Sequence, residues 1–206
     1  MERRNLCWNF VALLGASLIL SACSDASNEE SSSPESYLYV WQFDQDANDD
    51  PNFLSVINSD PDSEDYGTLV TTVPTSGVRG GAHHTSLVLP KSGFLFANDY
   101  KGNSSSIFDT SNSAAPAITQ SFSNKGDFNY AHSFSELANG NILGVFQTQG
   151  IDNAIAGGLV EMTTAGNIVQ TGDSISGDPN IFMRPYGLTM APEHDRAMTT
   201  NFDMLN

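Results

Sequence analysis

The chain has 206 residues, of which 24 are acidic and 8 are basic, so its formal net charge at pH 7 is −16. This negative charge repels the phosphates of nucleic acids and the headgroups of anionic lipids, and we exclude both as partners. Solubility, or adaptation to salty surroundings, explains the charge better than a role in recognition.

The N-terminal segment has the features of a secretory signal. Arg3 and Arg4 precede an apolar run from Phe10 to Leu20, which is shorter than the about 20 residues that a membrane-spanning helix needs. The sequence Leu-Ser-Ala-Cys that ends at Cys23 resembles the bacterial lipobox. This resemblance implies that residues 1–22 are a signal peptide and that the thiol of Cys23 is lipidated. The alternative is an ordinary cleaved signal followed by a chance cysteine.

The next segment, residues 23–36, is predicted to be a flexible tether because it is polar, acidic and free of large apolar residues. Acyl chains on Cys23 would hold the folded domain, residues 37–206, at a membrane of the bacterial cell envelope, on the periplasmic side or at the outer membrane. Cys7 leaves with the signal, so the mature domain has no thiol for a disulfide. This length suffices for one domain.

Short strands, separated by Gly, Asn, Ser and Pro, are predicted along the rest of the chain. No segment after the signal shows a helical period. The expected strands are 38–43, 53–57 and 68–73 in a first unit; 85–89, 94–98, 106–109 and 117–122 in a second; 132–136, 142–146, 159–162 and 168–171 in a third; and 187–190 and 197–201 in a fourth.

These units recur about every fifty residues, which is typical of a repeat fold. Four short strands per repeat indicate an all-β protein of the β-propeller class, with two complete blades and two incomplete ones, the first lacking its opening strand. A propeller needs at least four blades, and the sequence stops at 204–206 within the fourth unit. We therefore expect a truncated product or an incomplete gene model. A solenoid of open blades is the alternative.

Histidines open two of the repeats. His83 and His84 begin the second unit, His132 begins the third, and Tyr186 stands at the corresponding place in the fourth. Equivalent positions of a propeller point towards a common axis, so these histidines are candidate ligands of a metal ion. Neighbouring residues on a strand face opposite sides, so only one of His83 and His84 is expected to point inward. We align His84 with His132 and take it as the first choice.

Plainer roles exist for each of these residues. A histidine at the start of a strand can simply hydrogen-bond a turn carbonyl. His194 lies in an acidic turn and is expected to be solvated, whereas Tyr186 either packs or lines the channel. The acidic segment 44–50 begins like a calcium loop but lacks its glycine and its bidentate glutamate. We interpret this segment, and residues 60–65, as solvated loops.

Several short motifs together resemble the selenium-binding protein family, which includes the bacterial methanethiol oxidases. The resemblance runs from about Tyr37 to Met204 and covers about half of a typical member. The motifs are Phe53-Leu54-Ser55-Val56-Ile57-Asn58 with Asp60-Pro61 and Tyr66-Gly67, Ala82-His83-His84, Ala131-His132-Ser133-Phe134, Gly157-Gly158-Leu159-Val160-Glu161, Arg184-Pro185-Tyr186-Gly187, and Thr199-Thr200-Asn201-Phe202-Asp203-Met204.

The resemblance implies a seven-bladed propeller with a metal site near its axis. It further implies a copper-dependent oxidase that converts methanethiol, oxygen and water into formaldehyde, hydrogen sulfide and hydrogen peroxide. Imidazole suits copper, so His84, His132 and His83 are the candidate ligands, while the catalytic residues stay unknown. The cysteine associated with selenium in some members has no equivalent in this domain, so selenium binding is not carried over.

Two functions therefore stay open. The first is an envelope-anchored oxidase whose intact form oxidises a small thiol at copper. The second is a non-catalytic propeller that binds a protein or a ligand. No Gly-x-Ser-x-Gly elbow, phosphate loop or dinucleotide fingerprint supports hydrolase or nucleotide chemistry.

Overall fold

The computed structural model describes residues 36–43, 50–76, 80–174, 177–178 and 181–204, all within the unit Pro34–Asn206. The predicted signal peptide, Cys23 and nearly all of the tether lie outside the described residues, as does most of the acidic segment 44–50. Within the described ranges, no helix is long and apolar enough to cross a membrane.

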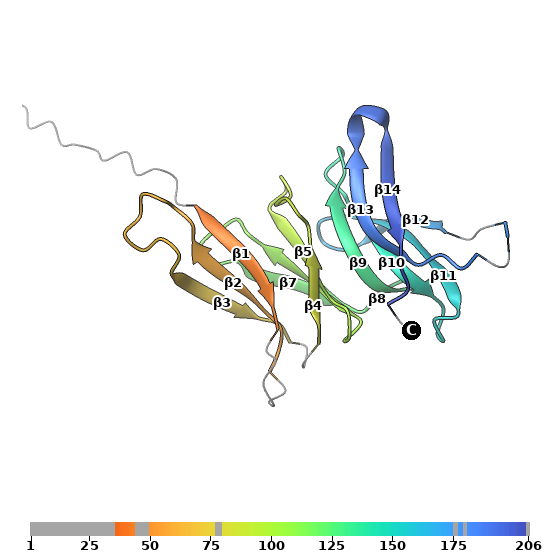
Figure 1. The fold of residues 1–206 in the computed structure, drawn as a ribbon, viewed down its shortest axis with the longest axis horizontal. Helices are drawn as coiled ribbons and strands as arrows, with labels where there is room; N and C mark the ends of the chain where they lie inside the picture. The colour runs from red at the N-terminus through yellow and green to blue at the C-terminus, as the bar shows by residue number, and fades with distance from the viewer. Residues whose placement is uncertain (1–35, 44–49, 77–79, 175–176, 179–180, 205–206) are drawn as a thin grey trace, which may run out of the picture. The chain divides into compact units, whose positions relative to one another are not determined.

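The described residues form antiparallel sheets, as the sequence predicts (Figure 1). The all-β, propeller-like fold class is confirmed, with a single short 3-10 helix at Pro192–His194 among the described residues. The first sheet contains β1 (Tyr37–Gln42), β2 (Phe53–Asn58) and β3 (Leu69–Pro74); the second contains β4 (Ala82–Thr85), β5 (Phe94–Asp99), β6 (Ser104–Asp109) and β7 (Ala117–Phe122); the third contains β8 (Asn124–Lys125), β9 (Phe128–Glu136), β10 (Ile142–Gln149), β11 (Ile155–Met162) and β12 (Ile168–Asp173); and the fourth contains β13 (Pro185–Ala191) and β14 (Arg196–Asn201).

The hairpin turns follow from the residues that the sequence supplies. Gly93 precedes β5 with φ 76°, and Gly140 joins β9 to β10 with φ 83°. Both values lie in the left-handed region, where a side chain is strained and glycine is not. These two turns repeat at the expected spacing and begin β5 and β10, which pair with β4 and β9.

The apolar core lies between neighbouring sheets. On β5, Leu95 and Ala97 face a cluster shared with the first sheet, where they meet Leu54 of β2. Phe96, between them, faces the opposite cluster with Phe146 of β10. Because successive side chains of a strand point to opposite faces, the second sheet is buried on both sides. The sheets therefore pack face to face, as the blades of a propeller do.

The opening strand of the second sheet differs from the prediction. The sequence predicts a strand at 85–89, but β4 ends at Thr85 and the following residues extend away from the ladder. Leu87 is 96% exposed. The strand is instead fixed at its beginning, where the carboxylate of Asp99 accepts the backbone N–H of Gly81 at 2.6 Å. A Cβ at Gly80 would overlap that carboxylate, so glycine is required there.

The opening strands of three sheets share an irregularity at the same place. Ala82 and Thr85 of β4 pair with Asp99 and Ala97 of β5. Two residues separate the first pair of residues on β4, whereas one residue separates their partners on β5. The same excess occurs in β9 between Ala131 and Phe134. In β13 it occurs between Pro185 and Leu188. Each is a β-bulge, which bends the strand and redirects side chains, and such bulges occur often beside functional sites.

Candidate metal centre

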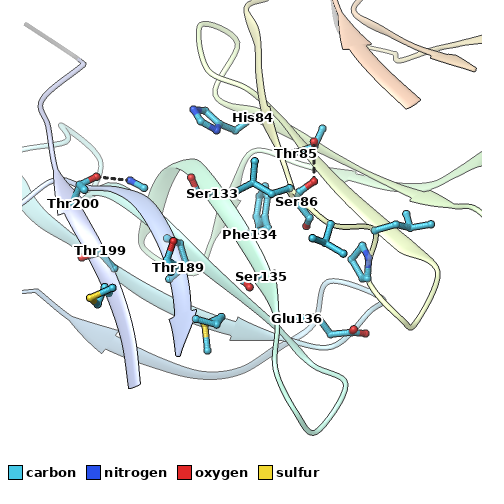
Figure 2. A pocket seen from close by; sticks show the side chains of 18 of the residues that line it. His84, Thr85, Ser86, Ser133, Phe134, Ser135, Glu136, Thr189, Thr199 and Thr200 are labelled. Carbon is cyan, nitrogen blue, oxygen red and sulfur yellow. Dashed lines mark hydrogen bonds between the residues drawn. The ribbon is translucent and has the colours of Figure 1, made fainter. Parts of the chain in front are cut away.

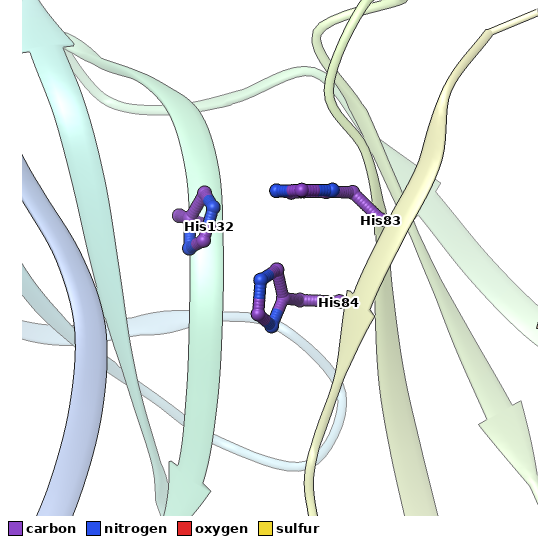
Figure 3. Close-up of side chains that lie close together, drawn as sticks. All are labelled: His83, His84 and His132. Atoms are coloured by element: carbon purple, nitrogen blue, oxygen red, sulfur yellow. The ribbon is translucent and has the colours of Figure 1, made fainter. Parts of the chain in front are cut away.

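Three histidines converge where β4 faces β9. Figure 3 shows the rings of His83 and His84 directed from β4 towards His132 on β9. The ring centroids of His83 and His84 lie 4.9 Å and 4.3 Å from that of His132, and those of His83 and His84 are 4.4 Å apart. One ring nitrogen from each residue can be chosen so that all lie within 4.8 Å of one another. The predicted ligand set is thus assembled in one place.

The structure corrects two expectations about these histidines. Strand alternation predicted that only one of His83 and His84 points inward, yet both rings lie beside His132. The bulge in β4 is the physical reason, since it breaks the alternation at these two residues. The strand pairing also aligns His132 with His83 and not with His84, because Ala82 and Ala131 hold the same place before their bulges.

His132 is the buried member of the cluster, with none of its surface exposed. Its Nδ1 lies 2.8 Å from the backbone oxygen of Tyr186 and 3.0 Å from the hydroxyl oxygen of Ser133. The hydroxyl of Ser133 donates to the same backbone oxygen at 2.9 Å. A carbonyl oxygen can only accept a hydrogen bond, so the ring nitrogen that lies 2.8 Å from it must donate, and the proton of the neutral imidazole belongs on Nδ1. Its Nε2 then carries the lone pair.

That Nε2 atom is buried and has no hydrogen-bond partner. A buried polar atom without a partner is costly and calls for an explanation. A metal ion would accept this lone pair, while the hydrogen bond at the other ring nitrogen orients the imidazole. The turn-carbonyl role expected as an alternative is therefore present at Nδ1 and leaves Nε2 available as a ligand.

The electrostatics keep all three imidazoles neutral. Burial first, and then the neighbouring His84 and His83, lower the pKa of His132 to about 3, and the hydrogen bond to the backbone oxygen of Tyr186 offsets only part of this. Burial also lowers the pKa of His83, and that of His84 falls through burial and through the charge of His83. Neutral imidazole is the form that binds a metal.

The nitrogen spacing is close to what a metal requires. Two nitrogens bound to the same ion at about 2.1 Å lie at most about 4.2 Å apart. Three nitrogens arranged evenly about one ion lie about 3.5 Å apart, whereas those of the cluster lie within 4.8 Å of one another, so a closure of about 1 Å brings the three atoms into range. The rings of His83 and His84 are not fully buried and can make this movement.

Asn98 of β5 holds the two histidine-bearing strands together. It is fully buried, and its side-chain oxygen accepts the backbone N–H of His84 at 2.5 Å. Its amide nitrogen donates to the backbone oxygen of Ala131, the neighbour of His132, at 2.9 Å. Trp41 of β1 donates to the backbone oxygen of Asn98 at 2.8 Å. One side chain thus connects both sides of the cluster.

The remaining sequence candidates take other roles. His194 is exposed and lies 3.7 Å from Glu193, as expected of a solvated turn residue. In the acidic loop 60–65, a side-chain oxygen of Asp60 accepts the backbone N–H of Asp62 at 3.0 Å, so this carboxylate stabilises a turn. Tyr186 both packs and faces the cluster, because its ring centroid lies 3.7 Å from that of His132.

A groove adjoins the histidines. It has a volume of about 810 Å³ and is bounded by the segment after β4, by the end of β9 and by the β13–β14 hairpin. Figure 2 shows His84, Ser133 and Thr200 near one end and Glu136 near the other. The apolar part of its lining comes from Leu87, Val88, Leu89, Phe134, Leu188, Met190 and Met198. The candidate metal ligand His84 is therefore part of the wall of a largely apolar groove.

Comparison with known proteins gives a partial match. No protein-family model matches the sequence. Over 94 residues the chain is 32% identical to a methanethiol oxidase from Hyphomicrobium sp., and this match covers 45% of the chain and 21% of that protein. The chain thus has weak, partial homology to methanethiol oxidase and matches about a fifth of that protein's length.

Solved structures share the fold at low identity. A hypothetical selenium-binding protein from Sulfolobus tokodaii superposes with a TM-score of 0.64 at 14% identity, over 83% of this chain and 41% of that one. A protein from Lactobacillus plantarum gives a TM-score of 0.57 at 11% identity, over 82% of this chain and 46% of that one. At these identities the likeness concerns the fold, which is of the β-propeller type.

Sequence reasoning missed Asn98 and the bulges. Asn98 is the last residue of the predicted strand 94–98, where a polar residue usually indicates an exposed strand end. The signal for its role is that it contacts Trp41 and the backbone beside the histidines. These contacts can be recognised only once the pairing of the strands is known. The bulges leave no composition signature at His83 and His132.

Proposed function

We propose that His83, His84 and His132 bind a copper ion and that the intact form of the protein oxidises a small thiol with oxygen. The observation that carries the proposal is the convergence of three neutral imidazoles on one point, where the buried Nε2 of His132 has no other partner. The partial match to a methanethiol oxidase supports a thiol as the substrate class, and copper is the metal that the family resemblance of the sequence motifs implies. Imidazole donors suit copper well.

Each residue has a separate task in this proposal. Bound copper would supply one-electron exchange between a thiol and oxygen. His132 would be the fixed ligand, since its Nδ1 is held by the backbone of Tyr186. His83 and His84 would complete the set from the opposite strand, and Asn98 would keep the backbone of His84 at the required distance from that of Ala131.

The groove supports a small, uncharged substrate. Its lining is largely apolar, and the carboxylate of Glu136 is already engaged by the backbone N–H groups of Lys91 and Ser92, at 2.7 Å and 2.9 Å. A neutral thiol would lose little hydration on entering such a groove, whereas a charged substrate would need a partner. His84 at the groove wall would bring the metal within reach of the sulfur.

Copper binding by purified protein tests the proposal. The metal-free chain is titrated with Cu²⁺ while bound copper is measured, and the variant His132→Ala is compared with His194→Ala. We expect one tightly bound copper in the unchanged chain and in His194→Ala, because His194 is exposed and is not part of the histidine cluster. His132→Ala combined with His84→Ala should abolish this binding. Unchanged copper uptake in the double variant would refute the metal site.

A second candidate function is ligand binding without catalysis. The observation in its favour is the groove of about 810 Å³ with exposed apolar residues, including Leu87 and Val88. Hydrogen peroxide release from methanethiol and oxygen separates the two functions. A copper-loaded protein that binds an apolar ligand but releases no peroxide would support the non-catalytic function.

We further propose that Cys23 anchors the protein to a membrane of the bacterial cell envelope. The support is the lipobox-like sequence before it and the acidic tether after it. Metabolic labelling with a radioactive fatty acid tests this in the expressed full chain. The label and membrane association should both be lost in Cys23→Ser and kept in Cys7→Ser. An unlabelled but secreted wild-type chain would show an ordinary signal instead.

A further inference from the structure

The bulge on β13 places a tyrosine where the two preceding repeats place a histidine. Tyr186 follows Pro185 at the start of its bulge, as His83 follows Ala82 and His132 follows Ala131. The three positions are therefore equivalent in strand pairing. Their side chains also meet in space, because the ring centroids of His83 and His132 lie 6.2 Å and 3.7 Å from that of Tyr186.

The hydroxyl of Tyr186 reaches the candidate metal centre. Its oxygen lies 3.4 Å from Nε2 of His83. The centroid of His84 lies 5.8 Å from the tyrosine ring, so all three histidines surround the phenol side chain. A hydroxyl this close to a ligand nitrogen needs only a small movement to approach an ion held by that nitrogen.

The ring of Tyr186 packs against two other rings. One face stacks on His132 with an angle of 34° between the planes. Phe202 lies against it at a centroid distance of 5.4 Å and an angle of 70°. The backbone oxygen of Tyr186 accepts from the hydroxyl of Ser133 and faces Nδ1 of His132. The hydroxyl is therefore directed by packing, as a metal-binding group should be.

The composition of the cluster leaves a place for an oxygen donor. The converging ligand side chains among the described residues are three imidazoles, with no carboxylate or thiolate. Cu²⁺ prefers four donors of nitrogen and oxygen type in a tetragonal arrangement. Three neutral imidazoles leave both charges of the ion uncompensated, and a phenolate oxygen would offset one of them.

We propose that the hydroxyl oxygen of Tyr186 is the fourth protein ligand of this metal centre and binds Cu²⁺ as the phenolate, with its proton released to solvent. This inference rests on the proposed function, since it requires that the three histidines hold copper. It goes further in assigning a ligand from the β13–β14 sheet. The metal centre then joins three neighbouring sheets instead of two.

Visible absorption of the Cu²⁺-loaded protein tests the assignment, because a phenolate bound to Cu²⁺ gives a charge-transfer band that imidazole ligands do not give. The variant Tyr186→Phe removes the hydroxyl and keeps the ring that stacks on His132. The matched control is Tyr100→Phe. The hydroxyl of Tyr100 donates to Gln147 at 3.5 Å, and the pKa of this phenol is raised to about 12, first by burial and then by the charge of Asp203.

We expect the band in the unchanged chain and in Tyr100→Phe, and its loss in Tyr186→Phe together with a fall in Cu²⁺ affinity of about 10-fold to 100-fold. A band that survives in Tyr186→Phe overturns the assignment. The assignment is also overturned if the unchanged chain binds Cu²⁺ in a way that depends on His132 but shows no such band. That result would leave the three-histidine site in place. Copper uptake that is indifferent to His84→Ala with His132→Ala refutes the site itself.

Discussion

The buried imidazole of His132 predicts a loss of stability in mild acid. Burial lowers its folded-state pKa to about 3, whereas the unfolded chain has the ordinary value of 6.5. Between these two values the unfolded state binds one more proton than the folded state. Stability is therefore present above pH 6.5 and is lost progressively as the pH falls towards 3.

The magnitude follows from the two pKa values. Between about pH 7.5 and about pH 5, protonation of this one group in the unfolded state costs about 2 kcal/mol of unfolding free energy. His83 and His84 add to the loss, because their folded-state pKa values are also lowered. Carboxylates such as Glu161, whose pKa is lowered by the amides of Asn141 and Asn139, contribute mainly at more acidic pH.

The assay is urea unfolding of the metal-free chain across this pH range, monitored by circular dichroism in the presence of a chelator. The variant His132→Gln removes the titrating group and keeps a donor for the backbone oxygen of Tyr186. Its stability should vary by about 2 kcal/mol less over the range than that of the unchanged chain. His194→Gln, at an exposed site, should follow the unchanged chain. If the stability of His132→Gln changes with pH as much as that of the unchanged chain, His132 is not a neutral buried group in the folded protein.

Three further variants test the packing around the centre. Asn98→Ala leaves the backbone N–H of His84 and the backbone oxygen of Ala131 without their partner, so it should lower stability by about 2–4 kcal/mol and weaken Cu²⁺ binding; unaltered binding would show that Asn98 does not position the ligands. Phe146→Ala removes a fully buried ring and should cost about 3–5 kcal/mol in urea unfolding, and a cost below about 1 kcal/mol would contradict the packed core between the sheets. Gly157→Ala would place a Cβ against the backbone of Phe146 and should cost about 1–3 kcal/mol, whereas Gly172→Ala, with open space at that position, should be nearly neutral and serves as its control.

The strands whose residues are fixed by local patterns were predictable from the sequence. β5 was expected at 94–98 and is observed at Phe94–Asp99, because a glycine turn precedes it and its buried residues alternate between two cores. β10 was expected at 142–146 for the same reasons and begins at Ile142. The repeat of about fifty residues then sufficed to indicate the propeller class.

The opening strand β4 was placed wrongly because local propensity and pairing disagree. Residues 85–89 are rich in β-branched and aliphatic side chains, which favours a strand. Their hydrogen-bonding partner is lacking, however, since the pairing with β5 ends at Thr85 and Ala97. The anchor of this strand is the carboxylate of Asp99, which binds Gly81 from 18 residues further along the chain. Such a contact depends on the folded sheet, and no local pattern at the strand itself predicts it.

The candidate site was predicted in its residues but not in its geometry. The repeats indicated His83, His84 and His132, and the structure brings these three together. Strict alternation would have turned one of the two adjacent histidines away. An extra residue in one strand changes which side chains face inward without changing the amino-acid composition, so the sequence could not separate these outcomes.

The recurrence of the bulge at one register has a consequence for altering the protein. In β4, β9 and β13 the residue after the first paired residue of the bulge presents its side chain to the cluster, and the hydrogen bonds that define the bulge are made by the backbone. The residue at that place can therefore be exchanged with little effect on the sheet that carries it. His83, His132 and Tyr186 then occupy structurally equivalent positions that can carry different donor side chains. A designer could vary the donors of this centre blade by blade while leaving the rest of each blade unchanged.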